Sequence, residues 1–250
     1  MTPVSFLSTL LTGLTDCAGP ATITSVIIFA FVLFFIIKCR GQQALFVIGG
    51  GFVVGMVVTT PLANLGLYDN WLNSEWFDIL TQWVHFFIEA FCLVVGCISL
   101  RDWRIYKATQ DTTRLLIRYP FLEEDLAVKR RWRLLWVWWI LVAYLSGTVT
   151  AMFVSVWPGN QSYFSVLQYR IFMQGLRGQT LFLALCYGLI FSSPLILELH
   201  CFKMAMDPAI KKKLTMALPK VQVVVAAVML AYGATMLYLY YVRFYLINQL

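Results

Sequence analysis

The segment TDCAGPATI, residues 15–23, places a carboxylate, a thiol and a helix breaker side by side in an apolar stretch. They are Asp16, Cys17 and the pair Gly19–Pro20. Proline lacks a backbone donor and the residue before it disfavours the helical region, so the segment predicts an interrupted helix. A thiol at such a point can take part in thiol–disulfide exchange. The adjacent carboxylate opposes this chemistry, because its negative charge disfavours the reactive thiolate.

A second candidate lies in WVHFFIEAFCLVVG, residues 83–96, where His85 and Glu89 are four residues apart. This spacing puts both side chains on one face of a helix. Ionisable residues within membrane segments usually serve proton or ion transfer. Together with Asp16, they could carry protons or bind a cation on one side of the membrane. His85 and Glu89 could equally satisfy each other or face water at the membrane rim.

The other residue types that commonly bind cofactors, histidine and cysteine, do not form a recognisable cofactor site in the sequence. The two histidines, His85 and His200, are expected near opposite membrane surfaces, so one haem cannot use both and a bis-histidine haem is not expected. Cysteines other than Cys17 have no metal-binding spacing and are expected to be packing residues: Cys39, Cys92, Cys97, Cys186 and Cys201. No metal site or other cofactor is therefore predicted. A phosphate loop and a nucleophile–base pair are also missing from the sequence, which disfavours hydrolases and nucleotide-using enzymes.

The elements that would position these residues are membrane helices. Of the 250 residues 60% are hydrophobic and only 12% are charged, more apolar surface than a water-soluble domain of this size can bury. We therefore expect an all-α polytopic membrane protein in contact with lipid. Six spans are predicted, at 5–37, 44–66, 79–99, 133–157, 180–199 and 221–248.

The first span is too long for a cleavable signal peptide, and no basic residue precedes it. In the second span, Gly51 and Gly55 have the GxxxG spacing of a close helix contact.

The basic residues predict an orientation. Of 19 Lys and Arg, all but Arg170, Arg177 and Arg243 fall on one side of these spans. Under the positive-inside rule this places both termini outside (periplasmic) in a bacterial-type cytoplasmic, or inner, membrane. The net charge of +7 then reflects topology and attraction to anionic lipid, and it gives no indication of nucleic-acid binding.

The spans divide into two halves, residues 1–100 and 133–250, joined by a hydrophilic cytoplasmic segment at 101–132. Three spans per half give two inverted three-helix repeats. The first helix of each repeat is expected to be broken, at Gly19–Pro20 and at Pro158–Gly159. Such paired breaks typically surround a central site. The alternative is that each break is a helix end followed by a loop.

These segments resemble the CcdA-type proteins related to the DsbD transmembrane domain, within the LysE-type superfamily. LLTGLTDCAGPAT is similar to their first span, GGGFVVGMVVTTPLANLGL to the second, and LVVGCISLRDW to the end of the third. The region from GNQSYF to SSPLILEL is also similar. The residues that match there are Gln161, Tyr163, Tyr187, Phe191, Pro194 and Leu195.

The resemblance implies passage of reducing equivalents from a cytoplasmic thioredoxin-like protein to an outside thiol partner, often for cytochrome c maturation. It places Cys17 at the first cysteine position of the family, whereas Pro158 occupies the second and Asp16 replaces the preceding proline. Three functions therefore stay open. They are a divergent thiol–disulfide conductor, a non-redox subunit or assembly factor of an electron-transfer complex, and a small-solute or cation transporter using Asp16, His85 and Glu89.

Overall fold

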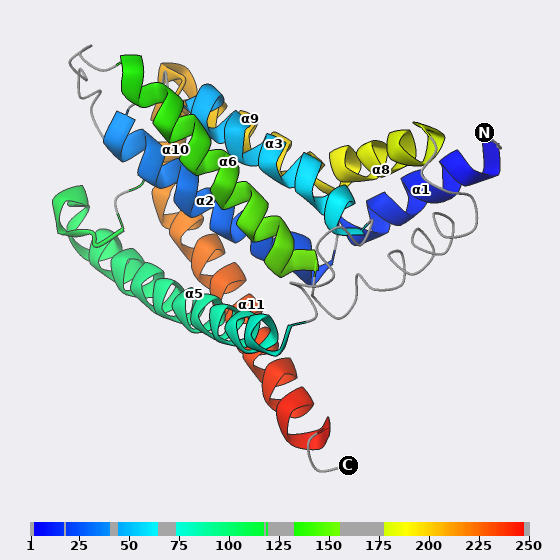
Figure 1. Ribbon diagram of the computed structural model, residues 1–250. Helices are drawn as coiled ribbons and strands as arrows, with labels where there is room; N and C mark the ends of the chain where they lie inside the picture. The colour runs from blue at the N-terminus through cyan, green and yellow to red at the C-terminus, as the bar shows by residue number, and fades with distance from the viewer. Residues whose placement is uncertain are drawn as a thin grey trace. The chain divides into compact units, whose positions relative to one another are not determined.

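The computed structural model describes residues 3–17, 19–40, 45–64, 74–117, 119, 133–155 and 178–247. All regular secondary structure in these ranges is helical, as the sequence predicts (Figure 1). The helices in chain order are α1 (Pro3–Asp16), α2 (Pro20–Arg40), α3 (Leu45–Asn64), α5 (Glu75–Thr109), the 3₁₀ turn η2 (Thr112–Arg114), α6 (Arg133–Ser155), α8 (Gly178–Phe191), α9 (Ser193–Ala205), α10 (Pro208–Met216) and α11 (Leu218–Ile247).

Four helices in the described part of the chain are long and apolar enough to cross a bilayer. They are Leu45–Ala63 in α3, Glu75–Thr109, Val137–Val154 in α6 and Leu218–Leu239 in α11. The bent pair α8–α9 is a fifth candidate. The predicted count of six is thus not confirmed. The difference arises at residues 5–37, which were expected to be one span broken at Gly19–Pro20. They form helices of 14 and 21 residues, and the apolar part found there among the described residues, Thr22–Phe34, is shorter than a span.

The first interruption lies where the sequence predicts a break, since α1 ends at Asp16 and α2 begins at Pro20. In a continuous helix the Asp16 carbonyl would accept a hydrogen bond from residue 20, but proline has no N–H to donate. The Asp16 carbonyl instead accepts from the Gly19 N–H at 3.0 Å and from the Thr22 hydroxyl at 2.7 Å. The chain thereby satisfies this carbonyl across the break.

The predicted fifth span, 180–199, is not one straight helix. It consists of α8 and α9, which meet at Ser192 with a bend of 42°. The physical cause is Pro194, which stands in the first turn of α9, where a missing N–H is tolerated. This break was not predicted, because Pro194 entered the predictions only through the resemblance to CcdA-type proteins.

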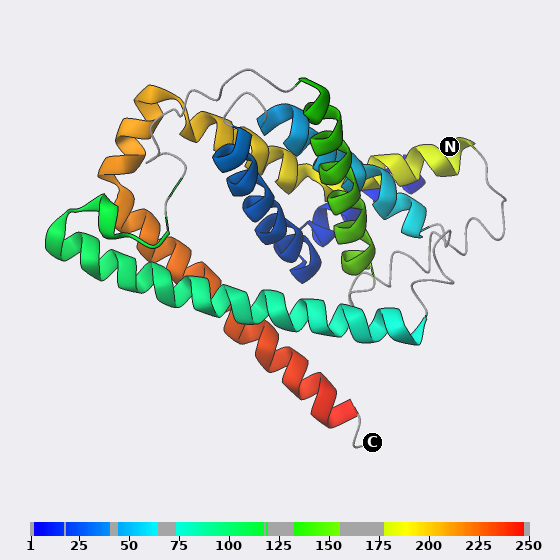
Figure 2. The same cartoon turned by 60° about the vertical axis from the view of Figure 1, so that its left-hand side comes forward.

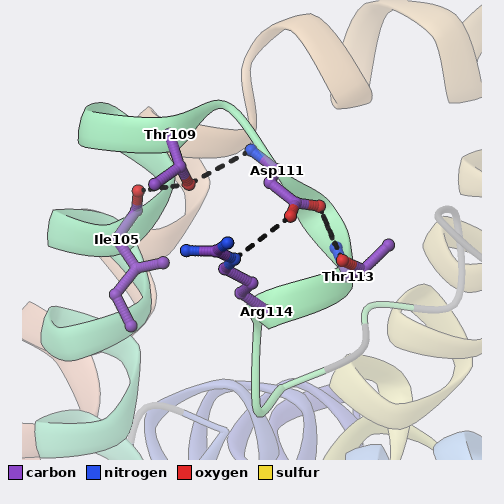
Figure 3. Close-up of polar contacts among 5 residues, drawn as sticks. All are labelled: Ile105, Thr109, Asp111, Thr113 and Arg114. Atoms are coloured by element: carbon purple, nitrogen blue, oxygen red, sulfur yellow. Dashed lines mark hydrogen bonds and ion pairs between the residues drawn. The ribbon is translucent and has the colours of Figure 1, made fainter.

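The predicted third span, 79–99, is shorter than the helix that contains it. α5 runs for 35 residues to Thr109, into the segment expected to begin the connecting loop at 101. Gln110 then adopts a left-handed conformation with φ 53°, and Asp111 caps the turn η2 (Figure 3). The turn directs the chain back toward α5, where the Ile117 N–H donates to the Asp102 carboxylate at 2.8 Å.

The chain divides into two compact units, Met1–Phe77 with Asp125–Met204, and Asp78–Glu124 with Ala205–Leu250. In the first unit α3 packs along α6, and α1 and α3 both pack on α8 (Figure 1). Glycines allow the α3–α6 backbones to approach closely: a Cβ at Gly51 would lie 3.0 Å from the Ile140 carbonyl oxygen, and one at Gly55 would overlap the Tyr144 carbonyl. The predicted close contact at Gly51 and Gly55 is thus confirmed, and Gly147 on α6, which was not predicted, contributes to it.

In the second unit α5 and α11 cross each other (Figure 2). Their closest approach again involves glycines, since a Cβ at Gly96 would lie 2.6 Å from Leu230, and one at Gly233 would lie 2.9 Å from the Glu89 carbonyl oxygen. Higher residue numbers on α5 therefore pair with lower numbers on α11, which makes the two helices antiparallel.

Candidate functional site at two helix breaks

The candidate site lies within the first unit, where the break after α1 meets the break between α8 and α9. Cys17, the residue that follows α1, donates a hydrogen bond from its thiol to the Ile190 carbonyl at 2.9 Å. Its sulfur also lies 3.8 Å from the Ser193 hydroxyl oxygen and 4.0 Å from the Phe191 carbonyl oxygen. The thiol is partly buried and is surrounded by oxygen atoms of the second break.

The position of Cys17 follows from the proline in the other helix. Ile190 precedes Pro194 by four residues, so its carbonyl has lost the N–H that a continuous helix would supply. The Ser193 hydroxyl donates to this carbonyl at 2.7 Å, and the Cys17 thiol is its second donor. A carbonyl freed by a proline in one interrupted helix is thus satisfied by a side chain from the other.

Asp16 makes the second link between the breaks. Its carboxylate accepts a hydrogen bond from the Tyr187 hydroxyl at 2.8 Å, across 171 positions of sequence. Tyr187 is 1% exposed and stacks on Phe191, which is equally buried. A buried aromatic pair therefore fixes the donor that holds Asp16, and α1 and α8 approach closely where a Cβ at Gly13 would lie 2.9 Å from Ile190.

Four residues on which the resemblance to CcdA-type proteins rests lie at this junction. Tyr187, Phe191 and Leu195 are buried, and Pro194 is the second residue of α9. Four further predicted residues lie outside the described residues: Pro158, Gly159, Gln161 and Tyr163. The predicted second break therefore stays a prediction, as does the inverted repeat.

The five cysteines whose side chains the structure describes are free: Cys17, Cys92, Cys97, Cys186 and Cys201. The contacts of the Cys17 sulfur found among the described residues are with oxygen atoms. In this arrangement the thiol is a hydrogen-bond donor. To act as a nucleophile it must lose its proton and leave the Ile190 carbonyl.

The predicted proton or cation residues are divided between the two units. Asp16 lies in the first, while His85 and Glu89 lie in the second, where both are buried. A single site formed by His85, Glu89 and Asp16 stays a prediction.

Of the two histidines, His85 is buried in the second unit and His200 is exposed on α9 in the first. Within the described residues no group of three or more His, Cys, Asp or Glu is placed to hold a metal ion.

Sequence reasoning missed three polar residues. Glu198, in the apolar run LILELH of α9, has a buried carboxylate oxygen without a hydrogen-bond partner in the described ranges. Asp102 and Gln222 are both fully buried. Glu198 could have been found by the rule that selected Glu89, namely a single carboxylate within an apolar stretch. Asp102 and Gln222 stand at boundaries between apolar and basic segments, where sequence does not predict burial.

Comparison of the chain with protein-family models, with curated proteins and with solved structures finds no match.

Proposed function

We propose that this chain is a CcdA-like membrane protein in which Cys17 exchanges disulfides with a thioredoxin-like partner. The observation that carries the proposal is the position of a free thiol where two interrupted helices meet. Sites in membrane proteins built from inverted repeats usually lie between broken helices. The similarity of residues 10–22 and of the Tyr187–Leu195 region to CcdA-type proteins supports the same function, because these two segments form the junction.

The exchange step needs one sulfur of this chain and a disulfide of the partner. The Cys17 thiolate attacks one partner sulfur, so a bond forms between them while the partner disulfide breaks. The departing partner sulfur takes up the proton that Cys17 lost. A further thiol then attacks the Cys17 sulfur, which forms a new disulfide with Cys17 and releases the partner as a dithiol. Because Pro158 occupies the second cysteine position of the family, this thiol belongs to another cysteine of the chain or to another protein.

The test is to trap this mixed disulfide in intact cells. Cells are acid-quenched, free thiols are alkylated with a mass-tagged maleimide, and the chain is compared with and without cytoplasmic thioredoxin. We expect a reductant-sensitive adduct that depends on thioredoxin and disappears in Cys17→Ser. Cys186→Ser, which removes a thiol from α8, is the control and should keep the adduct. A Cys17 thiol that stays fully alkylated in both strains contradicts the proposal.

A non-redox function, as a membrane subunit or assembly factor, is the second candidate. It is favoured by the bond from the Cys17 thiol to the Ile190 carbonyl, which serves the structure without redox chemistry. In this case Cys17→Ser should preserve stability, because serine can donate to the same carbonyl. Cys17→Ala should lower the free energy of unfolding by about 1 kcal/mol, the usual contribution of one hydrogen bond. Thermal unfolding in detergent separates the two variants.

A further inference from the structure

From Thr81 to Asp102, the buried face of α5 carries small or polar side chains. From Thr81 onward, the buried positions recur every three or four residues and so lie on one side of the helix. None of them carries a large aliphatic or aromatic side chain. We call them the α5 stripe: Thr81, His85, Glu89, Cys92, Gly96, Ser99 and Asp102.

The opposite face of α5 is apolar and exposed. Its large side chains include Ile79, Leu80, Trp83, Phe86, Phe87, Phe91 and Val94. A helix in water shows the reverse pattern, so this face suits lipid and the stripe suits the protein interior. Thr81 and Asp102 are 21 positions apart, which corresponds to about 32 Å at 1.5 Å per residue and is close to the thickness of a bilayer core.

Glu89 is the residue of the stripe whose burial is hardest to explain by packing. It is 1% exposed, and neither carboxylate oxygen has a hydrogen-bond partner in the described part of the chain. An unpaired carboxyl group buried in this way costs several kcal/mol if charged, which favours the protonated form. Ionisable side chains buried within membrane segments commonly mark proton or ion pathways.

α11 covers the middle of the stripe and adds a polar group to it. Gly233 lies against the Glu89 backbone and Leu230 against Gly96. Because the helices are antiparallel, Gln222, eight residues before Leu230, lies toward the Asp102 end. Its amide is fully buried, and neither amide atom has a hydrogen-bond partner among the described residues.

Titratable groups lie on both sides of Glu89. His85 and Cys92 are its neighbours along the stripe, and Tyr232 is the buried neighbour of Gly233 on α11. At the far end, Asp102 is fully buried, accepts from the Ile117 N–H and pairs with Arg101 at 3.3 Å.

We propose that the α5 stripe is a proton path across the membrane, with Glu89 as its central protonatable group. A proton reaches Glu89 by way of His85 and continues along the Cys92 thiol, the Ser99 hydroxyl and the Gln222 amide to Asp102, with water completing the hydrogen-bonded chain. Protons enter and leave unchanged in number. A metal cation fits less well, because no cluster of three acidic, His or Cys residues occurs in the described residues. This path does not depend on thiol chemistry at Cys17.

The test is proton flux into vesicles that contain the purified full chain. A pH-sensitive dye inside the vesicles reports proton uptake when valinomycin and a potassium gradient impose a potential. We expect flux above that of empty vesicles and a fall of about tenfold or more in Glu89→Gln, which keeps the shape but cannot carry a proton. Glu75→Gln, which changes an exposed carboxylate at the start of α5, is the matched control and should conduct normally.

A chemical measurement covers the case in which Glu89→Gln does not fold. Dicyclohexylcarbodiimide reacts with protonated carboxyl groups in apolar surroundings, and mass spectrometry identifies the residue it modifies. In the unmutated chain, loss of flux in step with modification of Glu89 supports the path. Flux equal to that of empty vesicles, or full flux with Glu89 modified or replaced by glutamine, overturns it.

Discussion

At the scale of the residue, two prolines determine the candidate site. Pro20 frees the Asp16 carbonyl and Pro194 frees the Ile190 carbonyl, because each proline lies four residues after the carbonyl that would have bonded to its N–H. The first carbonyl is satisfied locally by Thr22, and the second by Ser193 and by Cys17 from another helix. The sequence alone predicts that these carbonyls need donors. It does not identify Cys17 as a donor, since 173 residues separate it from Ile190.

Asp111 gives a prediction at the same scale. Hydrogen bonds from the Thr113 hydroxyl and then from the Thr113 N–H favour its charged form and lower the pKa of Asp111 below the ordinary 3.8 (Figure 3). A lowered folded-state pKa means that the contribution of this cap to stability is complete above the unfolded value and is lost as pH falls through the folded value. We expect the Thr113 amide resonance, followed by NMR in micelles, to titrate with a midpoint below 3.8.

Asp111→Asn is the control for this titration, because asparagine can accept the same bonds but has no proton to gain. The Thr113 resonance should then be independent of pH in the acidic range. A midpoint at or above 3.8 in the unmutated chain would show that the cap does not favour the carboxylate.

At the scale of the element, apolar periodicity locates helices but does not give their ends. α5 continues ten residues past the predicted end of its span, and Asp102, at that boundary, is buried and accepts a hydrogen bond from the Ile117 N–H. The GxxxG pair was predictable, since small residues four apart form a flat helix face whatever lies against it. The contact of Gly147 on α6 with this face could not be predicted, because spacing within one helix does not indicate which residue of another helix packs against it.

A matched pair of glycines in α3 tests this packing. A Cβ at Gly55 would overlap the Tyr144 carbonyl, whereas a Cβ at Gly50 would meet nothing within 4 Å. We expect Gly55→Val to lower the free energy of unfolding by about 1–3 kcal/mol more than Gly50→Val, the usual cost of overpacking. The change in helix propensity is the same in both variants and cancels. Equal losses in a detergent unfolding titration would mean that the α3–α6 contact is not tight.

At the scale of the whole molecule, the distribution of basic residues predicts that the segment after α5 and the segment around α10 face the cytoplasm. Labelling of single cysteines tests this, using the exposed positions Ala108 and Lys212 in an otherwise cysteine-free chain. We expect a membrane-impermeant maleimide to modify Ala108→Cys and Lys212→Cys in inside-out vesicles and neither in intact cells. Labelling of the two positions from opposite sides would exclude the predicted orientation.

The sequence by itself determined the helical membrane class, the break at Gly19–Pro20, the close contact of Gly51 and Gly55, and the shared face of His85 and Glu89. Each of these depends on composition or on residues within a few positions of one another. Only the tertiary structure decided that Tyr187 binds Asp16, that Cys17 binds Ile190, and that the buried side of α5 carries small or polar side chains from Thr81 to Asp102. These features depend on which helix faces are covered, and packing between distant segments decides that.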